Sequence, residues 1–218
     1  MQTNPVRFEA VFAALSLLIV ITACQFSNET IAEDQTIPAD HLDTAIFAGG
    51  CFWCSESDFD KLPGVISTTS GYIGGAVINP TYEQVVTGKT GHVEAVRIQF
   101  DKTVTDFETL LYAFWRTIDP VFPDGQFCDI GSQYRSAIFY LTPEQNASAK
   151  ASKNTLAVSG RFDLPIVTEI LPATTFYPAE DYHQDYYLKN PENYAQYRSK
   201  CGRDARLKQL WGGEALAH

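Results

Sequence analysis

The sequence has 218 residues, with 16 lysines and arginines against 26 aspartates and glutamates, which gives a formal net charge of −10. This excess of negative charge disfavours contact with phosphate backbones and excludes a nucleic-acid partner. Apolar residues make up 45% of the chain, which is enough for one sizeable core and excludes a disordered or fibrous protein. Five cysteines are an odd number, so at least one of them has a role outside a paired disulfide framework.

A short apolar run follows Arg7, over residues 10–23. It is shorter than the roughly 20 residues of a membrane-spanning helix, so residues 1–24 are predicted to be a secretion signal. The run ends in the tetrapeptide ITAC, which resembles the lipobox of bacterial lipoproteins, where the cysteine is acylated and becomes the new N-terminus. Cys24 is then a lipid anchor. The alternative is an ordinary cleaved signal, or an uncleaved anchor with an incidental cysteine.

The next segment, residues 25–42, is polar and acidic and has no helical or strand periodicity, which predicts a tether to a folded domain over residues 43–218. A lipidated Cys24 implies an envelope lipoprotein that faces the periplasm. Gln25 after the cysteine favours the outer membrane, by analogy with known lipoproteins. Without lipidation we expect a secreted or soluble periplasmic protein.

Hydrophobic periodicity and turn residues divide the domain into alternating strands and helices. The order without the C-terminal pieces is βαββαβ, which predicts an α+β fold, a two-layer ferredoxin-like plait with helices on one face of a sheet. After Pro178 we expect one short helix and an extended, wrapping C-terminal segment. In chain order, the predicted elements are a strand at 44–48, a helix at 51–62, strands at 65–72 and 92–100, a helix that begins with a capping box of Thr105 and Glu108, a strand at 136–141, a helix from Thr142 that ends before Gly160, and a strand at 164–171.

One acidic residue lies in the apolar phase of its predicted strand. Glu94 shares the period-two phase of Val96, Ile98 and Phe100, so its carboxyl is expected to point into the apolar side. Desolvation raises a carboxyl pKa, and a neutral acid can donate a proton in catalysis. The alternative is a strand-end glutamate that reaches solvent past Gly91.

Two cysteines, Cys51 and Cys54, stand where a strand, two glycines and a helix meet. Free N–H groups and the helix dipole stabilise a thiolate at the first turn, so Cys51 is the better candidate nucleophile. Cys54 lies three residues on, on the same helix face and within reach of a disulfide. The alternatives are a structural pair or half of a zinc site. Since no histidine stands in zinc-like spacing, we expect no metal.

Two irregular segments, residues 80–83 and 125–136, are rich in tyrosine and small polar residues. Loops of this kind carry functional groups on a rigid scaffold. Taken singly, Tyr82 and Tyr134 are more typical of packed aromatic residues, and Asp129 of a turn residue.

The sequence resembles the A-type peptide-methionine sulfoxide reductases from about residue 44 to about residue 191. Five blocks in the same order carry this resemblance. They are residues 50–54 (GCFWC), 71–75 (GYIGG), 90–96 (TGHVEAV), 131–138 (GSQYRSAI) and 179–184 (AEDYHQ). The family fold is a two-layer α+β plait, in agreement with the predicted order of elements.

The resemblance implies the chemistry of the site. Cys51 would attack the sulfur of methionine (S)-sulfoxide, in oxidised proteins or in free methionine sulfoxide, with no cofactor. The acid Glu94 would protonate the sulfoxide oxygen, which makes the sulfur a better electrophile. The remaining roles would fall to Phe52 and Trp53, which would hold the substrate methyl group, to Tyr82 and Tyr134, which would bind the oxygen, and to Asp129, which would position the substrate or the polar network.

The resemblance also implies that Cys51 becomes a sulfenic acid and then a disulfide, which a thioredoxin-like donor reduces. Many family members have glycine at the position of Cys54. In them, cysteines in a glycine-rich C-terminal tail form the disulfide with the sulfenic acid. Here Cys54 is adjacent, whereas Cys201 precedes a predicted docked helix, residues 202–211. We therefore favour Cys54 as the resolving thiol and keep Cys201 as a second relay. Cys128 is expected to be a buried structural thiol.

Two other functions explain fewer of these residues. A general thiol–disulfide oxidoreductase would use the CxxC pair without Glu94. A non-enzymatic envelope lipoprotein would have an unreactive Cys51–Cys54 pair that closes a turn. For the leading hypothesis we expect a monomer and a periplasmic thioredoxin-like partner, because an oxidising compartment would otherwise keep the pair closed.

Overall fold

The computed structural model describes residues 37–216 of the chain. The predicted signal at 1–24, the lipidation site Cys24 and most of the predicted tether lie outside these residues. Of the tether, the structure describes only its end, a 3-10 turn η1 (Ala39–His41), and strand β1 begins at Leu42. None of the helices within residues 37–216 has the length and apolar character that a membrane crossing requires.

The centre of the fold is a six-stranded sheet with the order β7-β6-β1-β3-β2-β8. The four strands β6, β1, β3 and β2 pair antiparallel, and β7 pairs parallel with β6 at one edge. This is the plait that the order βαββαβ predicts, so the predicted fold class is confirmed. The strands are β1 (Leu42–Gly49), β2 (Val65–Ile73), β3 (Val93–Asp101), β6 (Ser136–Tyr140), β7 (Glu169–Pro172) and β8 (Tyr177–Pro178).

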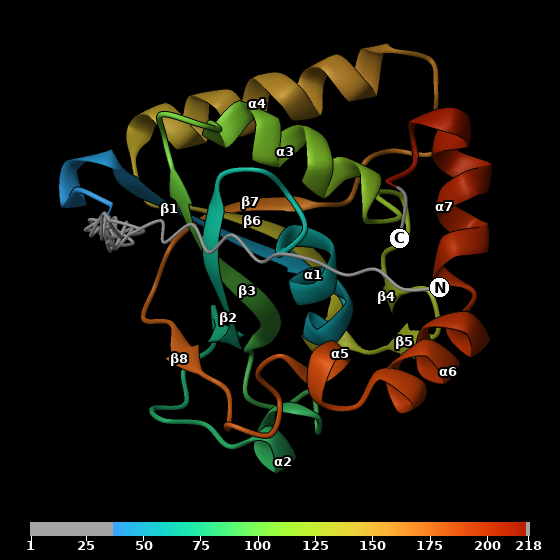
Figure 1. Ribbon diagram of the computed structural model, residues 1–218. Helices are drawn as coiled ribbons and strands as arrows, with labels where there is room; N and C mark the ends of the chain where they lie inside the picture. The colour runs from blue at the N-terminus through green and yellow to red at the C-terminus, as the bar shows by residue number, and fades with distance from the viewer. Residues whose placement is uncertain (1–36, 217–218) are drawn as a thin grey trace, which may run out of the picture. The chain divides into compact units, whose positions relative to one another are not determined.

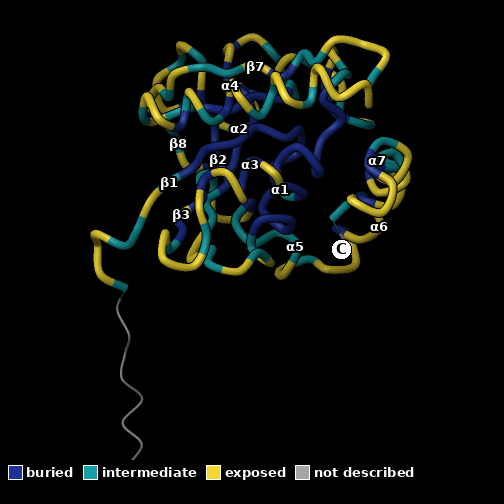
Figure 2. The backbone as a smooth tube through the Cα atoms, turned by 90° about the horizontal axis from the view of Figure 1, so that it is seen from above, coloured by how far each residue is buried: buried dark blue, intermediate teal, exposed yellow. Residues whose placement is uncertain are grey.

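Helices α1 (Phe52–Phe59), α3 (Phe107–Arg116) and α4 (Pro143–Val158) form the second layer (Figure 1). Alternate residues of β1 face opposite ways, because strand side chains alternate between the two faces of a sheet. Phe47 packs in the core beneath the helices, whereas Ile46 packs in a smaller core with Phe176. Figure 2 shows that burial is deepest in the sheet and α1, while α6 and α7 keep exposed outer faces.

Three predicted details are wrong. Helix α3 is capped by Asp106, whose carboxylate accepts from the Thr109 N–H at 2.7 Å, and not by a capping box that starts at Thr105. Strand β7 is shorter than predicted, because the Val167 N–H donates to the Pro120 carbonyl and the Thr168 carbonyl accepts from a lysine on α4. The C-terminal region is helical, with α5 (Tyr186–Lys189), α6 (Pro191–Cys201) and α7 (Arg203–Trp211), rather than one short helix and a wrapping tail.

Helix α6 escapes a hydrophobic-period search because polar side chains fill its buried positions. On α6 the buried residues are Tyr194 and Arg198. On α7, Arg203 is 1% exposed and donates to the carbonyls of Gly49 and Thr117 at 2.6 and 2.9 Å. The predicted docked helix after Cys201 is confirmed, and its anchoring arginine brings the C-terminal region against the β1–α1 junction.

Candidate active site

The two cysteines of the CxxC pair lie at the junction between β1 and α1. Gly50 turns the chain there with φ +85°, and a Cβ at this position would lie 2.5 Å from Gln126. Only glycine tolerates both the positive φ and the close approach of the Gln126 side chain. Cys51 is then the N-cap of α1. The Cys51 and Cys54 side chains are both buried, at 5% and 1% exposure, so the pair is not a surface feature.

Glu94 points into the core face of β3, as its phase predicts, and is 2% exposed. Its Oε2 accepts the backbone N–H of Phe52 at 3.0 Å, which holds the carboxyl beside the first turn of α1. Burial raises the pKa of Glu94 to about 8, because the charged form loses its hydration. At neutral pH this side chain is therefore mainly a protonated acid inside a largely apolar site.

The surroundings of the thiol pair favour an anion at Cys54 rather than at Cys51, the sulfur that the helix dipole would favour. Burial raises the pKa of Cys51 well above its ordinary value, and the negative charges of Cys54, Glu94 and Asp129 add to this rise. The pKa of Cys54 is lowered by a hydrogen bond from the Cys51 thiol. Of the two thiols, Cys54 therefore ionises more readily than Cys51, which is the opposite of the order that the helix dipole alone predicts.

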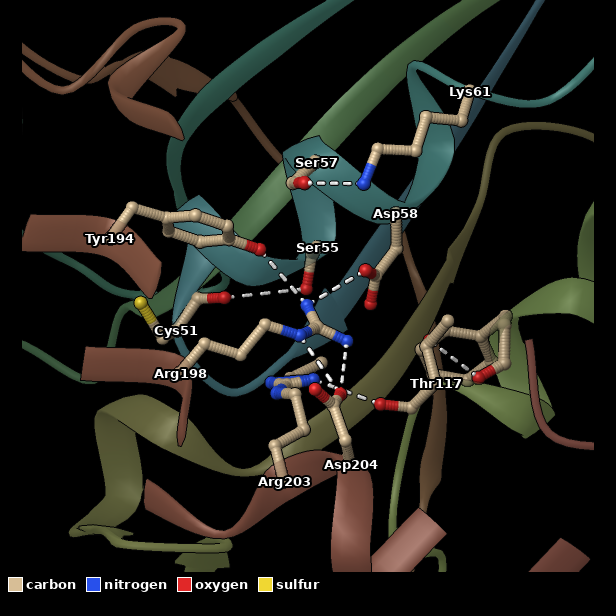
Figure 3. Close-up of polar contacts among 12 residues, drawn as sticks. Cys51, Ser55, Ser57, Asp58, Lys61, Thr117, Tyr194, Arg198, Arg203 and Asp204 are labelled. Atoms are coloured by element: carbon tan, nitrogen blue, oxygen red, sulfur yellow. Dashed lines mark hydrogen bonds and ion pairs between the residues drawn. The ribbon is translucent and has the colours of Figure 1, made fainter. Parts of the chain in front are cut away.

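Two buried arginines from the C-terminal helices also lower the pKa of Cys54. Figure 3 shows Arg198 and Arg203 beneath the first turn of α1. Arg198 donates to Asp58 at 2.8 Å and to the Tyr194 hydroxyl at 3.0 Å, so it is fixed in place. A fixed positive charge in a buried environment favours a nearby anion without any reorganisation.

A small pocket of about 80 Å³ opens beside Cys51. It brings together the predicted nucleophile, the predicted acid and all five residues predicted to bind substrate. Tyr197 also lines it, and the sequence prediction missed this residue. The lining side chains are Cys51, Phe52, Trp53, Tyr82, Glu94, Asp129, Tyr134 and Tyr197.

Two tyrosines, Tyr82 and Tyr134, line this pocket together with the acid. Burial and the charge of Glu94 raise the pKa of Tyr82 to about 12 and also raise that of Tyr134, so both remain hydrogen-bond donors at ordinary pH. Tyr82 begins the short helix α2 (Tyr82–Val85), and its backbone N–H donates to Glu180 at 2.9 Å. The carboxylate of Glu180 also accepts from the hydroxyl of Tyr72 on β2 at 2.8 Å, which ties α2 to the sheet.

The apolar wall of the pocket is held rigidly by aromatic contacts. The indole of Trp53 stacks on Tyr186 with centroids 3.7 Å apart and an interplanar angle of 7°. Its N–H donates to Nδ1 of His183 at 3.1 Å. Phe52 is 1% exposed and packs against the same histidine. Phe52 and Trp53 therefore offer a preformed apolar surface next to the reactive thiol.

Asp129 and Tyr197 form the polar wall. The Tyr197 hydroxyl donates to Asp129 Oδ2 at 2.5 Å, and Tyr197 lines the same pocket as Cys51. A sequence signal for Tyr197 exists, since Tyr194, Tyr197, Arg198 and Cys201 recur at helical spacing. Because one of these four residues is an arginine and two carry a hydroxyl group, the pattern does not resemble an ordinary buried helix face.

Cys128 and Cys201 form a disulfide with each other. The expectation that Cys128 is a buried free thiol is wrong, because it is exposed and covalently paired. Within residues 37–216 the free cysteines are Cys51 and Cys54. Cys201 does not line the pocket. Cys128, Asp129 and Cys201 lie close enough together to form a metal-ligand group, but the disulfide occupies both of its sulfurs.

Comparison with known proteins gives a consistent result. A family model described as peptide methionine sulfoxide reductase matches residues 43–215. Two relatives named peptide methionine sulfoxide reductase MsrA are similar over most of their length. The one from Halalkalibacterium halodurans is 56% identical over 171 residues, 78% of this chain and 97% of the relative. The one from Bacillus licheniformis is 52% identical over 174 residues, 80% of this chain and 96% of the relative.

Solved structures agree with these sequences. Methionine sulfoxide reductase A of Corynebacterium diphtheriae superposes with a TM-score of 0.62 at 37% identity, over 69% of this chain and 76% of that one. Reduced Mxr1 from Saccharomyces cerevisiae superposes with a TM-score of 0.65 at 29% identity, over 71% of this chain and 89% of that one.

Proposed function

Since the chain belongs to the peptide methionine sulfoxide reductase family, we propose that its pocket reduces methionine (S)-sulfoxide, in oxidised proteins and as free methionine sulfoxide, through a Cys51 sulfenic acid. The enzyme is an oxidoreductase of the methionine sulfoxide reductase class. One observation carries the proposal: a buried, protonated carboxyl, Glu94, shares a small pocket with the Cys51 thiol. A sulfoxide needs both a proton on its oxygen and a nucleophile at its sulfur.

The polar groups of the pocket define where the sulfoxide oxygen would lie. Glu94 donates its proton to this oxygen, and the hydroxyls of Tyr82 and Tyr134 donate hydrogen bonds to it, which stabilises the charge that develops during attack. The substrate methyl group packs on Phe52 and Trp53. Asp129 and Tyr197 complete the polar wall and position the substrate.

The oxygen transfer balances within the enzyme–substrate pair. The Cys51 sulfur bonds to the sulfur of the protonated sulfoxide. The oxygen then passes to Cys51: a sulfur–oxygen bond forms there, the substrate's sulfur–oxygen bond and the transient sulfur–sulfur bond break, and methionine leaves as a thioether. Cys51 is oxidised to a sulfenic acid, and no external electron is consumed in this step. The proton of the Cys51 thiol can pass to the Cys54 thiolate, to which it already donates a hydrogen bond.

Resolution follows within the same helical turn. Cys54, which took up the Cys51 proton in the first step, would attack the Cys51 sulfenic sulfur, form the Cys51–Cys54 disulfide and give that proton to the departing hydroxyl group, which leaves as water. Arg198 and Arg203 support this step because they favour the anionic form of Cys54. A thioredoxin-like dithiol donor would then reduce the disulfide. Cys201 would act as a second relay only after its bond to Cys128 is reduced.

Replacement of Cys54 by serine is expected to separate the two halves of the reaction. The first turnover should still release one methionine for each chain, because Cys51 and Glu94 are unchanged, but more slowly, because serine does not take up the Cys51 proton as Cys54 does. The sulfenic acid should then persist, since serine cannot resolve it. Quenched-flow measurement of methionine with dimedone labelling of Cys51 checks this result. Rapid disulfide formation in this variant would show that a different thiol resolves.

The stereochemistry of the reaction tests the proposed function. Reduced enzyme, residues 25–218, is incubated with dithiothreitol and the separated S and R epimers of N-acetyl-methionine sulfoxide. We expect consumption of the S epimer alone, because one arrangement of methyl group and oxygen satisfies both Trp53 and Glu94. If neither epimer reacts while insulin disulfides are reduced, the function is general thiol–disulfide exchange. If neither substrate reacts, the pocket has lost this chemistry.

The N-terminal sequence supports a second, separate part of the proposal. The lipobox-like ITAC at 21–24 would make the chain a lipoprotein of the bacterial envelope, with Cys24 acylated and the enzyme facing the periplasm, preferentially on the outer membrane. Metabolic labelling with a fatty acid should mark the full chain and not the Cys24→Ala variant. Equal absence of label from both chains would favour an ordinary secreted or periplasmic form.

A further inference from the structure

The Cys128–Cys201 disulfide joins two segments that each supply one residue to the pocket wall. Cys128 lies in the turn of a small hairpin, β4 (Gly125–Gln126) and β5 (Asp129–Ile130), and directly precedes Asp129. Cys201 ends α6, one helical turn after Tyr197. Neither sulfur lines the pocket, but Asp129 and Tyr197 both do. The bond spans 73 residues of sequence.

We infer that the Cys128–Cys201 disulfide is a positioning element, which holds Asp129 and Tyr197 in the geometry that receives the sulfoxide. The inference rests on the proposed function and adds to it. The bond acts through its neighbours: the Tyr197 hydroxyl donates to Asp129 at 2.5 Å, and both residues line the same small pocket as Cys51. The disulfide thus fixes from outside a contact in the pocket wall next to the nucleophile.

The hairpin needs such a tether. Strands β4 and β5 pair only with each other, apart from the main sheet, and an isolated two-stranded hairpin is marginally stable. Gln126 anchors its first strand through two hydrogen bonds to the backbone of Asp119, each 2.8 Å long. Beyond Gln126, Phe127 takes a left-handed conformation with φ 57° beneath the guanidinium of Arg203. The disulfide is the covalent restraint on the segment that carries Asp129.

The partner segment is fixed independently of this bond. Helix α6 is held by the ion pair between Arg198 and Asp58 at 2.8 Å, which is almost fully buried. Tyr197 also meets the edge of Trp53, with ring centroids 5.8 Å apart. Opening the disulfide is therefore expected to release mainly the hairpin, with Asp129, from a wall that otherwise stays in place.

The Cys128–Cys201 disulfide is more accessible to solvent than the Cys51–Cys54 pair. Cys128 is exposed, whereas Cys51 and Cys54 are buried. A reductant in solution can reach Cys128 directly, so the state of the bond can be set experimentally without chemistry at the nucleophile.

Substrate binding without turnover tests the inference. In a Cys51→Ser/Cys54→Ser variant of residues 25–218, Cys128 and Cys201 are the only cysteines. Isothermal titration with N-acetyl-methionine (S)-sulfoxide gives Kd with the bond closed and after reduction by dithiothreitol. We expect about tenfold weaker binding after reduction, the size of one lost charge-assisted hydrogen bond. Adding Cys128→Ser/Cys201→Ser should reproduce the weak binding and remove the response to dithiothreitol.

A mutant cycle distinguishes positioning from general loosening of the fold. With Tyr197→Phe in the same background, reduction of the disulfide should change Kd less than about twofold, because the contact that it supports is already gone. Glu214→Gln is a matched control: it weakens the ion pairs to Arg116 and Arg161 at the C-terminal end, away from the pocket, and should leave the response to reduction intact. An equal change of Kd with and without Tyr197→Phe would show a merely structural bond and overturn the inference.

The remaining outcomes are also decisive. Equal affinity in the closed and reduced states would overturn the inference, and would assign the pair to electron transfer if the Cys128→Ser/Cys201→Ser enzyme also lost activity with a protein dithiol donor but kept it with dithiothreitol. Absence of binding in both states would likewise overturn it. The proposed function would fail only if the wild-type enzyme also left the S epimer unreduced.

Discussion

Replacement of Cys51 by serine is expected to abolish reduction of methionine (S)-sulfoxide, with a loss of at least about a thousandfold in kcat. A serine hydroxyl can fill the space of the thiol at the N-cap of α1, but its oxygen cannot accept the sulfoxide oxygen and form a species that Cys54 resolves. Steady-state methionine production with dithiothreitol measures the effect.

Thermal unfolding and the Kd for substrate serve as controls for the Cys51→Ser variant. Because Glu94 and the aromatic wall are unchanged, thermal unfolding and the Kd for the S epimer should stay close to those of the wild type. Retention of more than about a tenth of wild-type activity would show that Cys51 is not the nucleophile, since covalent catalysis contributes far more than this factor.

Replacement of Glu94 by glutamine is expected to lower kcat/KM by about 10²- to 10⁴-fold, the usual contribution of a general acid. The amide is similar in size, and its oxygen can still accept the Phe52 N–H that Glu94 holds at 3.0 Å. It cannot deliver a proton to the sulfoxide oxygen. A loss below about fivefold would mean that the tyrosines supply most of the electrophilic assistance.

The raised pKa of Glu94 determines how activity and stability change with pH: both should fall as the pH rises. Burial raises its folded-state pKa from 4.5 to about 8, so the proton-donating form predominates below about pH 8 and kcat/KM should fall as the pH rises through this value. The same shift lowers the free energy of unfolding as the pH rises from 4.5 to 8, because the folded state holds a proton that the unfolded state has lost.

A second buried carboxyl also changes the free energy of unfolding with pH, but it does so equally in the wild type and in the Glu94→Gln variant. Burial also raises the pKa of Glu56 to about 8, so the wild type and the Glu94→Gln variant share that contribution. Their difference isolates Glu94. Chemical denaturation across the range from pH 4.5 to 9 measures it, and parallel curves would contradict the assigned pKa.

The elements that sequence reasoning predicted well are those with an apolar period. The strand that carries Glu94 alternates cleanly, so both its register and the inward direction of the carboxyl followed from phase. The junction at Cys51 followed from two glycines between a strand and a helix. These local signals placed the reactive pair and its acid, and they defined the order of strands and helices along the chain.

The features that sequence reasoning missed depend on contacts between distant parts of the chain. Helix α6 has polar buried positions, because Arg198 is neutralised by Asp58 from α1, and no periodicity scale scores such a face as core. The bond between Cys128 and Cys201 joins residues 73 positions apart, so no local sequence pattern predicts it. The local dipole argument assigned the thiolate to Cys51. The hydrogen bond from Cys51 lowers the pKa of Cys54 instead, and the charges of Arg203 and Arg198, which come from the C-terminal helices, lower it further.

One single-turnover experiment tests the central claim most directly. Fully reduced enzyme, freed of reductant, is mixed with excess N-acetyl-methionine (S)-sulfoxide, and the methionine formed and the cysteine connectivity are measured by mass spectrometry. The proposed mechanism predicts a burst of one methionine for each chain and a new bond between Cys51 and Cys54. Formation of methionine without any change at Cys51, or absence of a burst from fully reduced enzyme, would contradict it.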